Sequence, residues 1–263
     1  MSKSETNSNN GNAIVEVRDL TAGYGRTVIL KDIRFDVRAG EIFAILGGSG
    51  SGKSTLLKHM IGLTRPLSGT VIVDGTDITA AEGEERLNML KKIGVAYQSG
   101  ALFGSMTVLT NVALVLQEFT DLPDETIETI AQMKLKAVGL EEAAYKMPSE
   151  LSGGMRKRAA IARALAMDPK ILFLDEPSAG LDPVTSAQLD DLILELSRSL
   201  GITFVIVTHE LPSIFAVADR VIMVDKEAQT IIARGKPQEL RDGSDNPVVR
   251  QFFSRRVGKV GSA

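Results

Sequence analysis

A glycine-rich segment of the chain has the residues needed to bind phosphate groups. Residues 47–54 read GGSGSGKS, fit the pattern G-x-x-x-x-G-K-[ST], and lie between an apolar stretch (42–46) and one with helical spacing (53–63). Glycines let backbone N–H groups turn inward around a phosphate, and the start of a helix adds positive potential there. We therefore predict a phosphate-binding loop rather than an ordinary Gly/Ser-rich turn, with Lys53 at the β- and γ-phosphates and Ser54 on Mg²⁺. The predicted nucleotide contacts in this loop are Gly47, Gly48, Ser49, Gly50, Ser51, Gly52, Lys53, Ser54 and Thr55.

Two carboxylates follow a second apolar stretch. Residues 171–176 read ILFLDE, which predicts a buried strand that ends in Asp175 and Glu176. Asp175 is suited to orient Mg²⁺ through water, because magnesium keeps much of its hydration shell. Glu176 is suited to polarise an attacking water. The alternative is a strand that ends in two solvated acids, and the phosphate-binding loop favours the functional interpretation.

A second anion site is predicted at the start of a later helix. Residues 151–155 read LSGGM, and a serine with two glycines at a helix N-terminus can bind an anion. Taken alone, Ser152 is better explained as an N-cap that satisfies free N–H groups. A second phosphate site becomes reasonable if two chains face each other and each covers the nucleotide held by the other.

Taken together, these motifs resemble the ATPases of the ABC transporter family. The resemblance covers roughly residues 14–240 and includes the family's motifs in their order and spacing. The segments that carry it are the phosphate-binding loop, Gln98, LSGG at 151–154, LDE at 174–176, SAGLD at 178–182 and His209.

The resemblance implies an ATPase with ATP and Mg²⁺ as cofactors, acting as a homodimer with two ATP molecules at its interface. It implies that Tyr24 stacks on adenine, that Gln98 contacts Mg²⁺ and the attacking water, and that His209 contacts the γ-phosphate. The implied catalytic residues are Lys53, Gln98, Glu176 and His209, and the implied Mg²⁺ ligands are Ser54, Gln98 and Asp175. The residues implied to contact the ATP of the other protomer are Ser152, Gly153, Gly154 and Asp182.

Three of these residues also have plain structural explanations. Tyr24 could be an aromatic residue of a surface turn, and Gln98 an exposed loop residue, as glutamine usually is. His209 follows an apolar stretch and could be satisfied by backbone groups. His59 lies inside the helix after the phosphate-binding loop, and for it we predict a structural role.

A narrower resemblance connects the chain with one branch of this family. Residues 98–103 (QSGALF), 133–140 (MKLKAVGL) and 147–155 (MPSELSGGM) are similar to the ATPases of Mla-type phospholipid-transport systems, also called toluene-tolerance or MCE-type systems, of Gram-negative bacteria. Most ABC ATPases have glutamine where Met155 lies. The resemblance implies an ATPase on the cytoplasmic side of the inner membrane that powers phospholipid transport between the inner and outer membranes. The implied partners are an inner-membrane permease, a periplasmic MCE lipid-binding protein and a small STAS-domain protein.

Three other functions are alternatives to this one. A soluble, non-transport ABC ATPase usually has a coiled coil or a second ATPase domain, and the sequence has no long heptad run. An ABC transporter for another cargo, such as an organic solvent, an amino acid or a metal, is disfavoured by Met155 and by residues 98–103. A nucleotide switch that barely hydrolyses ATP is disfavoured by the presence of Glu176 and His209.

The elements that must position these residues alternate along most of the chain. Strand patterns at both ends, with helices between them, predict an α/β fold with a mainly parallel sheet; the resemblance implies a P-loop NTPase with an antiparallel β portion and a helical subdomain. We expect a disordered tail (1–12), an ATPase domain (13–245) with a helical subdomain inserted at about 85–165, and a C-terminal helix with a short tail (246–263). The predicted strands are 14–17, 28–30, 33–37, 41–46, 71–73, 171–174, 203–207 and 221–224, and the predicted helices are 53–63, 106–118, 124–138, 152–167 and 184–200.

Composition excludes several classes of site. The chain has 263 residues, is 44% hydrophobic, and has no cysteine and two histidines, so thiolate and multi-histidine metal centres are excluded. The net charge of −3 creates no basic field, and we expect no nucleic-acid partner. No apolar run approaches the roughly 18 residues of a membrane-spanning helix, so we expect any membrane role to come through a partner.

Overall fold

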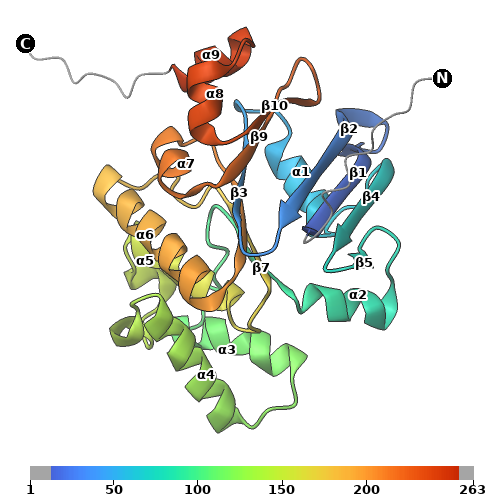
Figure 1. Cartoon of the computed structure of the whole chain (residues 1–263). Helices are drawn as coiled ribbons and strands as arrows, with labels where there is room; N and C mark the ends of the chain where they lie inside the picture. The colour runs from blue at the N-terminus through green and yellow to red at the C-terminus, as the bar shows by residue number, and fades with distance from the viewer. Residues whose placement is uncertain (1–12, 255–263) are drawn as a thin grey trace, which may run out of the picture.

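The computed structural model describes residues 13–254, in which two β-sheets pack against layers of helices (Figure 1). The predicted disordered tail (1–12) and residues 255–263 lie outside the described residues. One sheet is antiparallel and has the order β2-β1-β4-β5, and the other has six strands in the order β10-β9-β3-β8-β7-β6. The α/β fold with an antiparallel portion and a helical part is therefore confirmed.

The antiparallel sheet is built on a long hairpin. Its first two strands meet at a two-residue turn, with Tyr24 paired to Thr27. The short apolar stretches predicted as separate strands (14–17, 28–30 and 33–37) are segments of these two longer strands. Register shifts interrupt the alternation of side chains that marks a strand in the sequence, so the pattern predicts shorter elements. The strands are β1 (Ala13–Tyr24), β2 (Thr27–Arg38), β4 (Ser68–Val73) and β5 (Thr76–Asp77).

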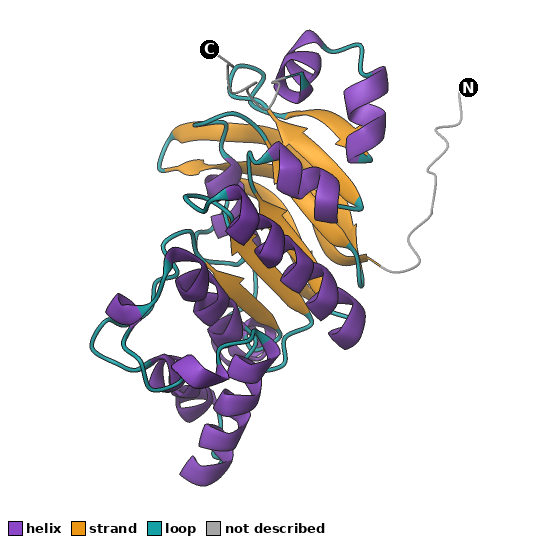
Figure 2. Cartoon of the chain, turned by 90° about the vertical axis from the view of Figure 1, so that its left-hand side faces the viewer, coloured by secondary structure: helices purple, strands orange, loops and turns teal. Residues whose placement is uncertain are grey.

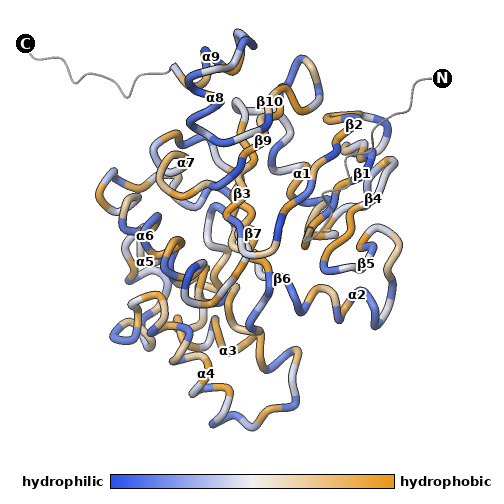
Figure 3. Tube along the Cα trace, in the orientation of Figure 1, coloured by the Kyte–Doolittle hydropathy of each residue, from blue (hydrophilic) through white to orange (hydrophobic). Residues whose placement is uncertain are grey.

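The six-stranded sheet is parallel from β9 to β6, with β10 antiparallel at one edge. Its central strands are buried on both faces, as apolar runs without alternation predict. In β7, Ile171 and Phe173 face the core beneath the antiparallel sheet, and Leu172 and Leu174 face the helices on the other side. Apolar residues concentrate along these strands (Figure 3). The strands are β3 (Ile42–Leu46), β6 (Ile93–Ala96), β7 (Ile171–Asp175), β8 (Thr203–Val207), β9 (Arg220–Val224) and β10 (Ile231–Gly235).

Helices cover both sides of the parallel strands. The helix after the phosphate-binding loop, α1 (Lys53–Met60), contacts β1, β7 and β8 and so packs between the two sheets. On the other side, helices lie in front of the strands when the molecule is viewed from the left of Figure 1 (Figure 2). The helices near this face are α6 (Pro183–Leu200) and α7 (Leu211–Val217), and the C-terminal pair is α8 (Pro237–Gly243) and α9 (Pro247–Phe253).

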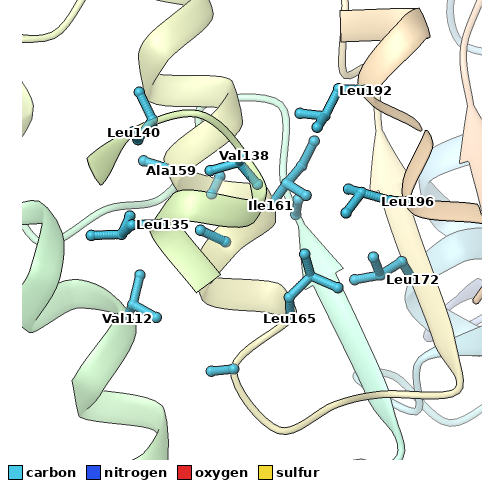
Figure 4. Packing of buried hydrophobic residues seen from close by; sticks show 14 of the residues in the cluster. Val112, Leu135, Val138, Leu140, Ala159, Ile161, Leu165, Leu172, Leu192 and Leu196 are labelled. Carbon is cyan, nitrogen blue, oxygen red and sulfur yellow. The ribbon is translucent and has the colours of Figure 1, made fainter. Parts of the chain in front are cut away.

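A helical lobe is attached below the parallel sheet. It consists of α3 (Val108–Phe119), α4 (Asp124–Ala137) and α5 (Gly153–Ala164). Its core is continuous with the core under α6, because Leu135, Val138 and Ile161 belong to the same hydrophobic cluster as Leu192 and Leu196 (Figure 4). The helical lobe and the ATPase sheet are therefore joined by packed side chains as well as by the chain.

The segment expected to be helical from about residue 85 also contains a strand. After α2 (Gly83–Leu90), β6 pairs in parallel with β7 and forms one edge of the main sheet, so the helical part begins after Ala96. The stretch is only four residues long, and Gly94 breaks its apolar pattern. A Cβ atom on Gly94 would lie 2.2 Å from the Ala164 carbonyl oxygen, so close packing against α5 requires glycine here.

Candidate functional site

The phosphate-binding loop connects β3 to α1, as predicted. Gly52 is the N-cap of α1 in the left-handed conformation (φ 95°), and a Cβ atom there would lie 2.8 Å from Ile29 Cγ2. At Gly47, a Cβ atom would lie 2.4 Å from the carbonyl oxygen of Val224 at the end of β9. Neighbouring strands therefore determine the path of the loop, and both glycines are needed for it.

Lys53 lies at the centre of this loop. Its Nζ donates hydrogen bonds to the carbonyl oxygens of Gly47 (2.9 Å) and Gly48 (3.0 Å). Burial lowers the pKa of Lys53, and the negative charges of Glu176 and Asp175 oppose this shift. The ammonium group is thus held inside the loop, with both carboxylates near enough to favour its charged form.

Asp175 and Ser54 meet between β7 and the first turn of α1. Ser54 Oγ donates to Asp175 Oδ1 at 3.4 Å. Burial raises the pKa of Asp175, the Glu176 charge adds to the increase, and Ser54 and Lys53 oppose it. The pair fits Mg²⁺, which commonly binds through one or two protein oxygens while phosphate and water complete its coordination. Among residues 13–254, no cluster of three His, Cys, Asp or Glu side chains could hold a metal by itself.

Glu176 and His209, which are far apart in the sequence, lie side by side in the structure. The Glu176 side chain is buried, and its Oε1 is 2.8 Å from His209 Nδ1. Glu176 Oε2 is also buried and has no hydrogen-bond partner among the described residues. A buried carboxylate oxygen without a partner is costly, which makes this atom a candidate for contact with a reacting water.

Gln98 lies on the exposed loop that follows β6, so the structure places its side chain in solvent. Its carbonyl oxygen accepts a hydrogen bond from Lys157 Nζ (2.6 Å), and the same Nζ donates to the carbonyl oxygen of Glu176 (3.0 Å). The loop of Gln98 is thereby tied to the loop of Glu176 through α5.

The residues predicted to contact the ATP of a second protomer cap helices in this chain. Ser152 Oγ accepts a hydrogen bond from the Met155 N–H (3.2 Å) at the start of α5, which is the N-cap alternative. Asp182 Oδ1 accepts from the N–H groups of Val184 and Thr185 (both 3.0 Å) at the start of α6, and the Thr185 contacts lower its pKa. The side chains of Ser152 and Asp182 are exposed, so capping orients these side chains while they stay accessible.

The two helix starts pack closely against each other. A Cβ atom on Gly154 would lie 2.4 Å from Thr185 Cγ2, so the second glycine of the LSGG motif allows α5 to approach α6. Gly153 is half-buried at the same turn. Met155 is half-buried and packs against the hydrophobic cluster of the helical lobe.

Tyr24 at the end of β1 and His59 on α1 lie near each other, since His59 contacts the backbone of Gly23. Tyr24 ends β1, is 43% exposed, and has Lys58 Nζ 5.8 Å from its ring centroid. His59 is fully buried: its Nε2 accepts from the Gly23 N–H (3.2 Å) and its Nδ1 donates to the Thr64 carbonyl oxygen (2.8 Å). Both ring nitrogens are satisfied in the neutral form, and burial lowers the pKa of His59, in agreement with the structural role predicted for it.

Three residues that form hydrogen bonds to the loop after β6 could not be recognised from the sequence patterns. Besides Lys157, Arg163 on α5 donates to the carbonyl oxygens of Gly100 (3.0 Å) and Ala101 (2.7 Å). Asn111 on α3 is fully buried and accepts from the Phe103 N–H (2.7 Å). Basic residues on a helix are usually solvated, so residue type alone does not single out Lys157 or Arg163. Only Asn111 is marked in the sequence, because it is a polar amide within the apolar stretch 108–116.

A buried carboxyl group beside residues 178–182 leads to a prediction about pH. Asp190 on α6 is buried next to Ser213, and burial raises its pKa to about 6, with a further increase from Asp191 and an opposing effect of Ser213. The unfolded-state pKa is about 3.9. Because the folded-state value is higher, Asp190 contributes stability below pH about 4, and this contribution is lost as the pH rises through about 6.

We expect Asp190→Asn, which mimics the neutral acid, to gain thermal stability relative to the wild type as the pH rises. The difference in melting temperature should grow by about 4–8 °C between about pH 4.5 and 7.5, measured by differential scanning calorimetry. His59 titrates in the opposite sense in both proteins and therefore cancels in the difference. Glu195→Gln is the control, because Glu195 is exposed on the same helix and does not shift the pKa of Asp190. A difference for Asp190→Asn that does not change with pH would contradict the prediction.

Comparisons with known proteins agree with this site. The sequence model of the ABC transporter family matches residues 30–179. The chain is 43% identical to the intermembrane phospholipid transport system ATP-binding protein MlaF of Escherichia coli K12 over 91% of this chain and 88% of the relative. It is also 43% identical to the probable ribonucleotide transport ATP-binding protein mkl of Mycobacterium leprae, over 94% of this chain and 71% of that protein.

Solved structures agree as well. One is the dimeric structure of an ATP-binding cassette in a post-hydrolysis state bound to ADP and Pi, with 32% identity and a TM-score of 0.76 over 85% of this chain and 98% of that chain. Another is cbiO1 from Clostridium perfringens, part of the ABC transporter complex cbiONQ, with 34% identity and a TM-score of 0.80 over 93% of this chain and 96% of that chain.

The chain belongs to the ABC transporter family. It is the ATP-binding and ATP-hydrolysing subunit of an ABC transporter, and its resemblance to the Mla-type ATPases is confirmed by the identity over most of its length. No helix within residues 13–254 is long and apolar enough to cross a membrane.

Proposed function

We propose that the chain hydrolyses ATP with Glu176 as the general base and powers phospholipid transport between the inner and outer membranes. The observation that supports the catalytic assignment most directly is Glu176 Oε2, which is buried without a partner while Oε1 is held by His209. One carboxylate oxygen is thus oriented by the protein, and the other remains free to accept a proton from water.

The remaining roles are those that the resemblance to ABC ATPases implies, and the positions of the side chains around the loop support them. Lys53 contacts the β- and γ-phosphates, and the Gly47–Thr55 backbone surrounds them. Tyr24 stacks on adenine from the exposed end of β1. Ser54, Asp175 and Gln98 would hold Mg²⁺, which would neutralise charge on the phosphate oxygens, and Gln98 would also contact the attacking water. His209 orients Glu176 and contacts the γ-phosphate.

We further propose that two chains form a head-to-tail homodimer. Ser152, Gly153, Gly154 and Asp182 then contact the nucleotide bound by the other protomer. Support comes from the exposed cap side chains of Ser152 and Asp182 and from the dimeric state of related cassettes. Residues 13–245 act as one ATPase domain with an inserted helical part, and residues 246–263 form its C-terminal extension.

The cargo is proposed from the relatives and from one branch-specific residue. Relatives at the same 43% identity are named for phospholipid transport and for ribonucleotide transport, so identity does not separate the two. Met155 packs against the helical lobe. Methionine at this position is, with residues 98–103 and 133–140, a feature that the sequence shares with Mla-type ATPases. We therefore favour phospholipid.

The partners are an inner-membrane permease, a periplasmic MCE lipid-binding protein and a small STAS-domain protein, with the chain bound peripherally on the cytoplasmic side. A groove of about 470 Å³ between α2 and the helical lobe supports permease docking. Its walls include Leu87, Phe119 and Met167, and its basic residues are Arg86, Lys91 and Arg163. An apolar groove with basic residues fits a short amphipathic helix of the permease that has acidic ends.

The test is co-expression with the Mla-type permease, MCE and STAS proteins of the same genome. We expect the four proteins to purify together, ATP hydrolysis to rise severalfold over the isolated chain, and labelled phospholipid to move between proteoliposomes. Leu87→Asp in the groove should lose the complex, whereas Leu122→Asp, at an equally exposed leucine outside the groove, should keep it. Full activity of the isolated chain with no captured permease would refute the assignment, and transport of ribonucleotide instead would change the cargo.

A further inference from the structure

One ammonium group joins the helical lobe to two loops of the hydrolytic centre. Lys157 lies on α5, in the turn after the LSGG motif. Its Nζ donates to the carbonyl oxygen of Gln98 (2.6 Å), after β6, and to that of Glu176 (3.0 Å), after β7. Both acceptors are backbone atoms, so the contacts fix the positions of the loops rather than the rotamers of their side chains.

The backbone at Glu176 needs such contacts. Glu176 has a positive φ of 47°, a conformation that costs energy for a residue other than glycine and persists only where neighbours impose it. Its N–H donates to the Val207 carbonyl oxygen (2.8 Å), and its own carbonyl oxygen accepts from Lys157 and from the Ala179 N–H (3.2 Å). Of these three contacts to the Glu176 backbone, the one from Lys157 is made by a side chain and comes from α5.

Lys157 is half-buried, and its ammonium group makes two contacts with backbone carbonyl oxygens. Burial lowers the pKa of Lys157, and the charges of Glu176 and Asp175 oppose the shift. A partly buried cation therefore lies beside the two carboxylates with its hydrogen bonds directed at carbonyl oxygens. A side chain without a donor there would remove this contact from the Gln98 carbonyl oxygen and leave the Glu176 carbonyl oxygen with the Ala179 N–H alone.

Helix α5 is suited to carry a displacement to this group. Below Lys157, Ala159 and Ile161 of α5 and its C-cap Leu165 are buried among side chains of α4 and α6 (Figure 4). Above it, Gly154 packs against Thr185. The start of α5 and Lys157 are within two turns of one rigid helix, so a shift of the LSGG motif moves the ammonium group with it.

We propose that Lys157 is a positioning residue that couples the LSGG motif of α5 to the hydrolytic centre of the same chain by holding the loops of Gln98 and Glu176 together. This role rests on the proposed function of Glu176 as the base. With α5 in the position that the structure shows, Lys157 holds both loops in the arrangement that hydrolysis needs. When α5 moves, Gln98 and Glu176 lose their common donor.

The experiment measures steady-state ATP hydrolysis by the full chain, in its transporter complex, for Lys157→Met, Lys157→Arg and Lys157→Gln. Methionine keeps a long chain without a donor, and we expect kcat to fall about tenfold or more with KM for ATP changed less than about threefold. Arginine retains the charged donors and should restore kcat to within about threefold. Glutamine keeps a neutral donor and should give an intermediate value.

Arg158→Met is the matched control. Arg158 is the next residue on α5 and donates to the Val138 carbonyl oxygen (3.2 Å) within the helical lobe, so its loss should change kcat less than about twofold. A melting temperature for each variant separates loss of folding from loss of positioning. Equal losses of kcat in Lys157→Met and Arg158→Met, or a rise in KM without a fall in kcat, would overturn the proposal.

A double variant distinguishes the proposed role of Lys157 from the proposed role of Glu176 as the base. If Lys157 acts through Glu176, adding Lys157→Met to Glu176→Gln should lower the residual activity by less than about twofold. Normal hydrolysis by Glu176→Gln alone would refute the base assignment whatever Lys157 does. A strongly impaired Glu176→Gln together with a fully active Lys157→Met would refute only the role of Lys157.

Discussion

Replacing Glu176 with glutamine should lower ATP turnover by about 10² or more while leaving ATP binding intact. Glutamine has nearly the same shape and can still hydrogen-bond to His209, but it cannot accept a proton from water at neutral pH. In the structure, Glu176 Oε1 is engaged by His209 Nδ1 and Oε2 is buried without a partner, so the substitution removes the basic oxygen without opening the site.

The binding and hydrolysis steps can be separated experimentally. Calorimetry should give a nucleotide affinity within a few-fold of wild type, and with ATP the variant should accumulate as a closed dimer in size-exclusion chromatography. Glu210→Gln, at a half-buried acid whose Oε1 lies 3.8 Å from His209 Nε2, is the matched control and should hydrolyse ATP at nearly the normal rate. Near-normal turnover by Glu176→Gln would show that a different group activates the water.

Replacing Ser152 with glutamate should abolish ATP hydrolysis in the assembled complex. The serine is exposed at the start of α5, where a nucleotide of the other protomer is proposed to bind, and a carboxylate there would face phosphate charge across a closing interface. The serine also caps α5 through the Met155 N–H, so the effect of charge must be separated from loss of the cap.

Two further variants make this separation. Ser152→Asn keeps an N-cap of similar strength without charge and should retain activity within about tenfold. Met155→Gln alters a half-buried side chain that packs against the helical lobe, and we expect it to retain activity within a few-fold. The measurement is steady-state hydrolysis by all three variants. If Ser152→Asn or Met155→Gln is as inactive as Ser152→Glu, the effect comes from local folding of α5 and not from charge at the interface.

The sequence by itself determined the parts of this protein whose signal is local. The loop between β3 and α1 could be predicted because glycines, a lysine and a serine occur at fixed spacing between an apolar run and a helical one. The strand that ends in Asp175 and the helices α4 and α6 were predicted to within about two residues, since periodicity and flanking prolines mark them along the chain. Side-chain roles at these positions remain predictions from type and spacing.

Tertiary structure decided the features that depend on residues far apart in the chain. His209 and Glu176 are 33 positions apart, and Lys157 and Gln98 are 59 apart, so nothing local indicates that these pairs form hydrogen bonds. Strand β6 is similar: four residues interrupted by a glycine become a strand because β7 supplies the hydrogen bonds and α5 the packing. Local propensity is a weak influence beside such contacts, because a short segment adopts whichever conformation satisfies its backbone groups and buries its apolar side chains.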